Sequence, residues 1–112
     1  MESILTSIKK NLGPTEEYDH FDPDIIMHIN SVLSNLTELG VGPSEGFMIQ
    51  DEKDTWDEFI GEDPRLNHVK TYVYLRVKLV FDPPSNSALI AAMQKEIDKL
   101  EWLINVAAET LS

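Results

Sequence analysis

Residues 67–84 read NHVKTYVYLRVKLVFDPP, and the conformation of this stretch decides the fold of the whole chain. Its composition is typical of a β-strand, because β-branched and aromatic residues fit a pleated surface. Its length argues against a strand. There is no glycine or proline from Arg65 to Phe81, and one uninterrupted strand would exceed the usual length of about 3–10 residues.

The residues that flank this stretch favour a helix. Asp63 can cap the first backbone amides, and Pro64 suits the first helical position. The Pro83–Pro84 pair would end the helix. We therefore predict a helix over residues 64–82.

Three further main helices are predicted over residues 2–12, 22–39 and 87–107 from apolar residues that recur at helical spacing. Their apolar stripes are Ile4, Leu5, Ile8 and Leu12; Ile25, Ile29, Val32, Leu36 and Leu39; and Leu89, Met93, Ile97, Leu100 and Ile104. Gly13–Pro14 would end the first helix, Asp22–Pro23 would begin the second and Gly40 would end it, and residues 85–87 would cap the last.

Residues 41–62 are predicted to form a long, irregular, acidic loop, because glycines interrupt every pattern there. Residues 47–49 read as a short strand or as a loop anchor. Asp54, with Asp57 three residues later, would cap a short helix that turns Trp56 and Phe59 inward. A loop this long in a small domain is functional or disordered, and its aromatic residues argue against full disorder. The predicted fold is all-α, a compact bundle of four main helices in a single domain over residues 1–112.

Composition excludes several classes of protein. The 112-residue chain has no cysteine, which excludes disulfides and thiolate metal sites. No apolar run approaches the roughly 18 residues of a membrane span, so we expect no membrane partner. The N-terminus lacks the basic-then-apolar order of a signal peptide, and we expect the chain to start at its natural end.

Charge is segregated along the chain, whose net charge is -11. Residues 14–63 contain fourteen acidic side chains and one basic one, whereas residues 64–81 contain four basic side chains and no acidic one. Nucleic-acid binding requires clustered lysine and arginine, which the acidic half lacks. Three interpretations remain open: a solvated acidic face, an acidic surface that meets the basic segment of a neighbouring subunit, or the lining of a passage that DNA crosses without sticking.

No template for catalysis or metal binding is satisfied. The three histidines are far apart in the sequence, and nothing marks a carboxylate pair among the twenty acidic residues. Residues 51–62 resemble a calcium loop only superficially, since Lys53 and Thr55 stand at ligand positions and Trp56 replaces the turn glycine. We predict no catalytic residue, no cofactor, no metal and no enzymatic activity.

Two apolar features indicate binding. The predicted helix 64–82 is apolar nearly all round, interrupted by Lys70, Arg76 and Lys78. It is either the central helix of the bundle, with its bases extended to solvent, or a helix partly covered by another subunit. Residues 102–104, Trp-Leu-Ile, would either dock into a partner or close the end of the core.

The order of motifs resembles a known family. LxxIKKxLG, FDPDIIMHINSVLxxLxxLGVG, a W-x-x-F element, VKTYVYLRVKLVFDPP and MxxxIxxxEW follow one another from Ile4 to Trp102. In this order and spacing they resemble the small head-tail connector proteins of tailed bacteriophages and of prophages of Gram-positive bacteria. One departure is Leu103, where members often carry a base.

The resemblance implies a helical structural protein of the virion that forms a homo-oligomeric ring, expected to be a dodecamer, beneath the portal protein. Such a ring extends the DNA channel, lets DNA pass without sequence-specific binding, and docks the next head-completion or tail-terminator protein. The protein would lie at the head-tail interface of the virion, and in the host cytoplasm during assembly.

This interpretation assigns two sets of candidate residues. The expected subunit or partner interface comprises Lys70, Arg76, Lys78, Trp56, Phe59, Trp102 and Leu103. The acidic residues expected to lie toward the channel or a subunit boundary are Asp51, Glu52, Asp54, Asp57, Glu58, Glu62 and Asp63. Two other classes of protein stay open: an acidic phage-encoded regulator or DNA mimic that binds a host protein, and a small hydrolase or metal-dependent enzyme.

Overall fold

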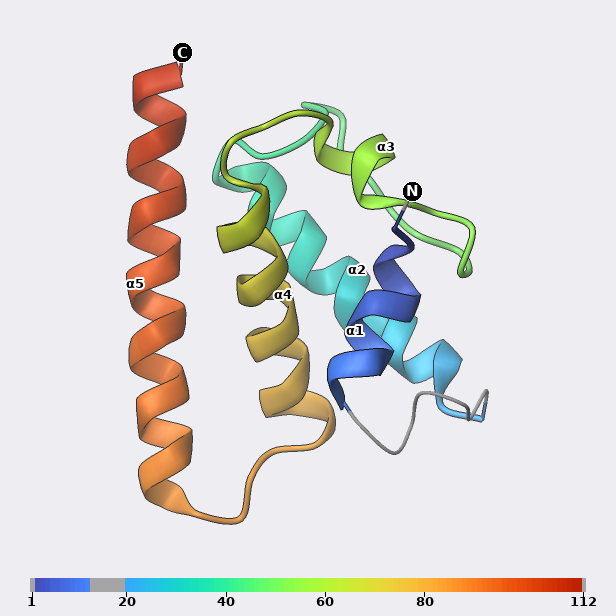
Figure 1. Ribbon diagram of the computed structural model, residues 1–112, viewed down its shortest axis with the longest axis vertical. Helices are drawn as coiled ribbons and strands as arrows, with labels where there is room; N and C mark the ends of the chain where they lie inside the picture. The colour runs from blue at the N-terminus through green and yellow to red at the C-terminus, as the bar shows by residue number, and fades with distance from the viewer. Residues whose placement is uncertain (1, 13–19, 112) are drawn as a thin grey trace.

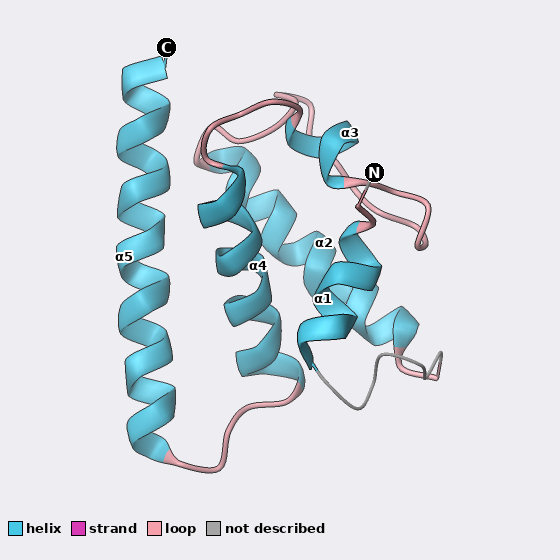
Figure 2. Ribbon diagram, viewed as in Figure 1, coloured by secondary structure: helices cyan, strands magenta, loops and turns pink. Residues whose placement is uncertain are grey.

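The computed structural model describes the backbone of residues 2–12 and 20–111, and side chains as far as Val106. This part of the chain contains helices α1 (Ile4–Leu12), α2 (Asp22–Glu38), α3 (Trp56–Ile60), α4 (Leu66–Phe81) and α5 (Ser87–Leu111) (Figure 1). It contains no strand, only an isolated bridge between Ser3 and Thr55 (Figure 2). The all-α prediction is confirmed. The predicted stops at Gly13–Pro14 lie outside the described residues.

The strand-like stretch forms α4, the central helix of the bundle. α4 packs against α1, α2 and α5 (Figure 1), and its Val69, Tyr72, Val73 and Val77 are buried. Contacts on several sides explain why an apolar sequence of strand-forming residues is stable as a helix, since packing overrides local propensity. α4 is therefore the central helix of the bundle, and whether another subunit covers part of it stays a prediction.

The predicted caps are wrong at the starts of α2 and α3, and the cap predicted before α4 forms only in part. α2 begins at Asp22 itself, without a side-chain cap, and the Asp22 carboxylate forms an ion pair of 2.7 Å with Lys9. α3 is capped by Thr55, not Asp54, in a reciprocal capping box with Glu58. α4 begins at Leu66 without a side-chain cap on Arg65, but the Asp63 carboxylate accepts a hydrogen bond from the Arg65 amide just before the helix (2.8 Å).

The other helix ends agree better with the sequence. Gly40, in a left-handed conformation (φ 85°), follows α2. The Gly40 amide donates to the Thr37 carbonyl, and the Val41 amide donates to the Leu36 carbonyl. These are the paired hydrogen bonds of a Schellman motif. Asn86 accepts hydrogen bonds from the amides of residues 88 and 89, as expected for the cap of α5.

The last helix is longer than predicted and is only partly packed. It continues to Leu111 instead of residue 107, since residues 107–111 include no glycine or proline. Its predicted stripe is buried at Ile97, Leu100 and Ile104, but Leu89 is 55% exposed. At 1.5 Å per residue α5 is about 37 Å long and α4 about 24 Å, and α5 extends beyond α4 at both ends (Figure 1).

The segment between α2 and α3 is held to the body of the protein. Residues 47–49 are a loop anchor and not a strand. The Asn30 side chain donates to the Ile49 carbonyl (3.0 Å) and accepts from the Ile49 amide (2.8 Å). Near α3, the Ile4 amide donates to the Asp54 carbonyl (3.0 Å).

We predict that Gly42→Ala destabilises the fold more than Gly46→Ala. Both glycines have positive φ, 77° and 96°, so both substitutions should cost about 1 kcal/mol of backbone strain. A Cβ at Gly42 would also lie 2.5 Å from the Phe59 ring, whereas one at Gly46 meets nothing within 4 Å. Because Phe59 is buried against Phe47, overpacking should add about 1–3 kcal/mol. Urea unfolding of both variants measures the difference, and equal losses would contradict this account.

Candidate interaction surfaces

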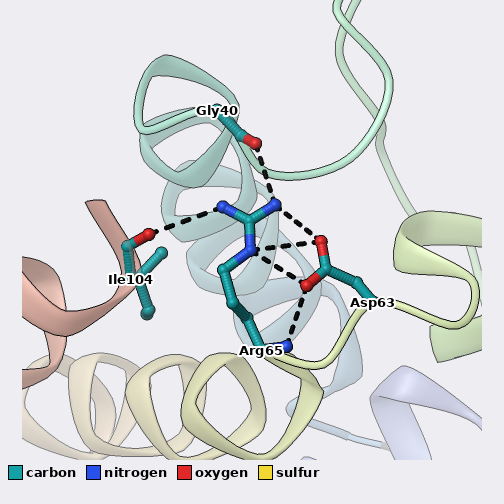
Figure 3. Close-up of polar contacts among 4 residues, drawn as sticks. All are labelled: Gly40, Asp63, Arg65 and Ile104. Carbon is teal, nitrogen blue, oxygen red and sulfur yellow. Dashed lines mark hydrogen bonds and ion pairs between the residues drawn. The ribbon is translucent and has the colours of Figure 1, made fainter. Parts of the chain in front are cut away.

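Arg65 joins three parts of the fold at one buried point (Figure 3). Its guanidinium donates to both carboxylate oxygens of Asp63, with Nη2 to Oδ2 at 2.6 Å. It also donates to the Gly40 carbonyl after α2 (3.1 Å) and to the Ile104 carbonyl of α5 (3.5 Å). Asp63, predicted to cap α4 and to belong to the acidic loop surface, therefore positions this arginine.

Four of the seven candidate acidic residues have structural partners. The first is Asp63. The Asp51 carboxylate accepts a hydrogen bond from the Lys53 amide (2.8 Å), and the Asp54 carboxylate accepts one from the Gln50 amide (2.6 Å). The fourth, Glu58, completes the capping box of α3. These carboxylates shape the segment before α4.

The other three acidic candidates are available to a partner. Glu52, Asp57 and Glu62 are exposed, and within the described residues their carboxylates form no hydrogen bond or ion pair. Whether they face a channel or a subunit boundary stays a prediction, now confined to these three side chains.

The three basic candidates on α4 already have partners within the subunit. Lys70 pairs with Glu2, and Lys78 pairs with Asp82 one turn later (3.0 Å). Arg76 donates to the Tyr72 hydroxyl (2.6 Å). All three side chains are partly exposed, so a role between subunits stays a prediction.

Tyr72 is the centre of a polar cluster that the sequence did not reveal. Its hydroxyl donates to Glu101 of α5 (2.6 Å) and accepts from Asn35 of α2 (2.8 Å), in addition to Arg76. Burial, and then the hydrogen bond to Glu101, raises the pKa of the Tyr72 hydroxyl. Because the members come from three helices, no spacing in the sequence could have indicated the cluster.

The aromatic candidates divide into buried and exposed residues. Trp56 and Phe59 are buried in the core of the subunit, and the Trp56 indole donates to the Ser7 hydroxyl (2.8 Å). Trp102 is 65% exposed, so it does not close the end of the core. Leu103 is partly buried and Ile104 is fully buried. Trp102 is thus the aromatic candidate that a partner can reach.

A groove runs along α2 and was not predicted. It has a volume of about 980 Å³ and lies between α2 and residues 44–48. Met27 and Met48, at 60% and 71% exposed, stand beside Phe47 in its lining. Glu38 and Glu45 line it as well.

The described part of the chain offers neither a membrane span nor a metal site. No helix there is long and apolar enough to cross a membrane. No group of three or more histidine, aspartate or glutamate residues there is arranged to hold a metal ion.

We predict that Asp63→Asn lowers the free energy of unfolding at pH 7 by about 1–3 kcal/mol, because it weakens the hydrogen bonds of a buried arginine. The Arg65 side chain holds the pKa of Asp63 below its ordinary value of 3.8. The native protein should therefore keep this contribution above about pH 4 and lose it progressively at lower pH, as the Asp63 carboxylate takes up a proton. Denaturant titrations from pH 7 to pH 2 measure both effects.

Asp82→Asn is the matched control, because Asp82 forms an exposed ion pair with Lys78. Its cost should stay below about 1 kcal/mol. The account of Asp63 fails if the two variants lose the same stability at pH 7, or if the loss in Asp63→Asn does not shrink in acid.

A comparison with protein-family models finds a match over residues 4–110 to the family described as "Phage connector protein". No curated protein and no solved structure matches the chain significantly. The family match includes all five described helices except the last residue of α5. The chain belongs to the phage connector protein family.

Proposed function

We propose that this protein is a head-tail connector that assembles into a ring beneath the portal, extends the DNA channel and docks the next head-completion or tail-terminator protein. The observation that carries the proposal is the family match over residues 4–110. The role is structural, and the protein would be part of the virion, at the head-tail interface. A dodecamer is the assembly we expect, with residues 1–112 acting as one connector domain.

The exposed apolar side chains on α5 support a role in assembly. Leu89 and Ile90 continue the stripe of Ile97 and Leu100, yet both are exposed in the isolated chain. A helix stripe of this kind is normally buried, so a partner that covers the start of α5 would remove apolar surface from water.

The three unpaired carboxylates support a role beside DNA. Glu52, Asp57 and Glu62 lie within twelve residues of one another in the segment around α3, with Lys53 as the single base there. A wall of this charge repels phosphate and gives passing DNA nothing to bind. We therefore assign these three residues to the channel side of the ring.

The same placement weighs against a DNA mimic. A mimic must present a continuous set of carboxylates in place of phosphates. Here Asp51, Asp54, Glu58 and Asp63 are already engaged within the subunit, which leaves three candidates without a partner among the described residues.

The proposed function predicts the phenotype of a phage that lacks this gene. DNA-filled heads without attached tails should accumulate, because the portal would have no docking surface for the next protein. A tagged copy should restore infectious particles, copurify with portal and tail proteins, and appear in electron micrographs as a ring below the portal. Normal tailed particles without the protein, or copurification with a host nucleic-acid-binding protein alone, would overturn the proposal.

A second prediction tests the channel assignment. Particles that carry Glu52→Lys, Asp57→Lys and Glu62→Lys should eject DNA more slowly than the wild type, and the delay should decrease with added salt, because a basic wall binds phosphates. Stability should change little, since exposed substitutions usually cost within about 0.5 kcal/mol each.

The matched control changes the same number of charges elsewhere, with Asp24→Lys, Glu96→Lys and Asp98→Lys, all at exposed positions. Ejection from these particles should keep the wild-type rate. Equal delays in both sets of particles, or no delay in either, would remove the three residues from the channel.

A further inference from the structure

A second stripe runs along the outer face of α5. Ala88, Ala92, Lys95, Lys99 and Trp102 are spaced by four, three, four and three residues, and all are exposed. At about 100° per residue they lie on the side of the helix opposite Ile97, Leu100 and Ile104, which face the core. We call these five residues the α5 stripe.

The charges of the α5 stripe lack a counterpart in the subunit. Within the described residues, neither Lys95 nor Lys99 forms an ion pair. Trp102 completes the stripe with a large apolar surface. An aromatic side chain flanked by unpaired cations on an otherwise acidic protein favours a partner surface that is apolar at one point and acidic around it.

The groove along α2 offers such a surface. Met27, Phe47 and Met48 provide its apolar contacts, and methionine sulfur packs well against aromatic rings. Glu38 and Glu45 are exposed, and within the described part of the chain neither has a hydrogen-bond or ion-pair partner.

The two asparagines and the arginine of the groove lining are already engaged. Asn30 binds the backbone of Ile49, and both Asn35 and Arg76 bind the Tyr72 hydroxyl. Arg76, the cation in the lining, also forms an ion pair with Glu101 (3.7 Å). The groove therefore presents the negative charge of Glu38 and Glu45 to a partner, opposite in sign to the α5 stripe.

We propose that the α5 stripe of one copy of this chain docks into the α2 groove of a second copy, with Trp102 between the two methionines and Lys95 and Lys99 beside Glu38 and Glu45. The charged and aromatic part of the stripe is shorter than the groove. Met27 and Glu38 are eleven residues apart on α2, or about 16 Å, whereas Lys95 and Trp102 are seven residues apart, or about 10 Å.

The stripe and the groove are different surfaces, so the contact is head-to-tail. A row of copies keeps one unused stripe at one end and one unused groove at the other, and such a row closes into a ring when the rotation at each contact allows it. A symmetric pairing of two α5 stripes would instead bring four lysines together. This inference rests on the proposed ring and names the surfaces that form it.

Cysteine crosslinking tests the contact, because the natural chain contains no cysteine. A variant with Lys99→Cys and Glu38→Cys, oxidised at high protein concentration, should give a ladder of disulfide-linked dimers, trimers and larger species. Either single variant should stop at dimers, since each then has one thiol. A variant with Lys99→Cys and Asp57→Cys is the matched control, because Asp57 is exposed but lies outside the groove, and it should give no ladder.

Charge reversal gives an independent readout by sedimentation velocity. Lys95→Glu with Lys99→Glu should weaken self-association about tenfold or more, as should Glu38→Lys with Glu45→Lys. All four substitutions in one chain should restore much of the association, because the opposite charges meet again. The contact is overturned if the Lys99→Cys, Glu38→Cys variant gives no ladder, or if the Asp57 control gives a ladder of equal strength. It is also overturned if the variant with all four charge reversals associates no more strongly than the two double variants.

The same crosslinking in purified particles separates this contact from the proposed function. Particles that contain the protein but yield no ladder would exclude the contact and leave the connector role intact. A ladder from the purified chain, together with particles that lack the protein, would exclude the connector role and leave the contact intact.

Discussion

The buried guanidinium of Arg65 is the constraint on which the arrangement of the helices depends. A buried charge is stable only when it is paired and its donors are satisfied. Asp63 neutralises it, and the carbonyls of Gly40 and Ile104 accept its remaining hydrogen bonds. Gly40 follows α2, Asp63 precedes α4 and Ile104 belongs to α5 (Figure 3). The hydrogen bonds of the arginine are therefore complete only when all three helices are in place.

The position of α5 depends on α4 more than on any other helix. Ile97, Leu100 and Ile104 are buried, and the Tyr72 hydroxyl holds Glu101 near the middle of α5. Both ends of α5 extend beyond α4 (Figure 1), and Leu89 and Ile90 at its start are exposed. The subunit therefore has a well-packed centre and an incompletely covered flank, an arrangement suited to a protein whose final partners are other chains.

Charge in this protein has two separate uses that the sequence does not distinguish. Asp63 and Glu58 stabilise the chain where it enters α4 and α3, whereas Glu52 and Asp57 face solvent. The basic residues of α4 belong to the first group, because Lys70 and Lys78 meet acids of their own subunit. Unpaired charges, and not total charge, indicate where a partner of opposite sign can bind.

The sequence by itself determined the helices, because periodic apolar residues and the Gly40 and Pro83–Pro84 stops act locally. It also indicated the family, through motifs that stay in order along the chain. Only the tertiary structure decided what each polar side chain does. Asp22 and Asp54 stand where caps are expected, yet Asp22 pairs with Lys9 and Asp54 binds the Gln50 amide. Trp56 is buried and Trp102 is exposed. The physical reason is that a carboxylate or an indole takes the partner that folding brings near it, and residues distant in sequence supply that partner.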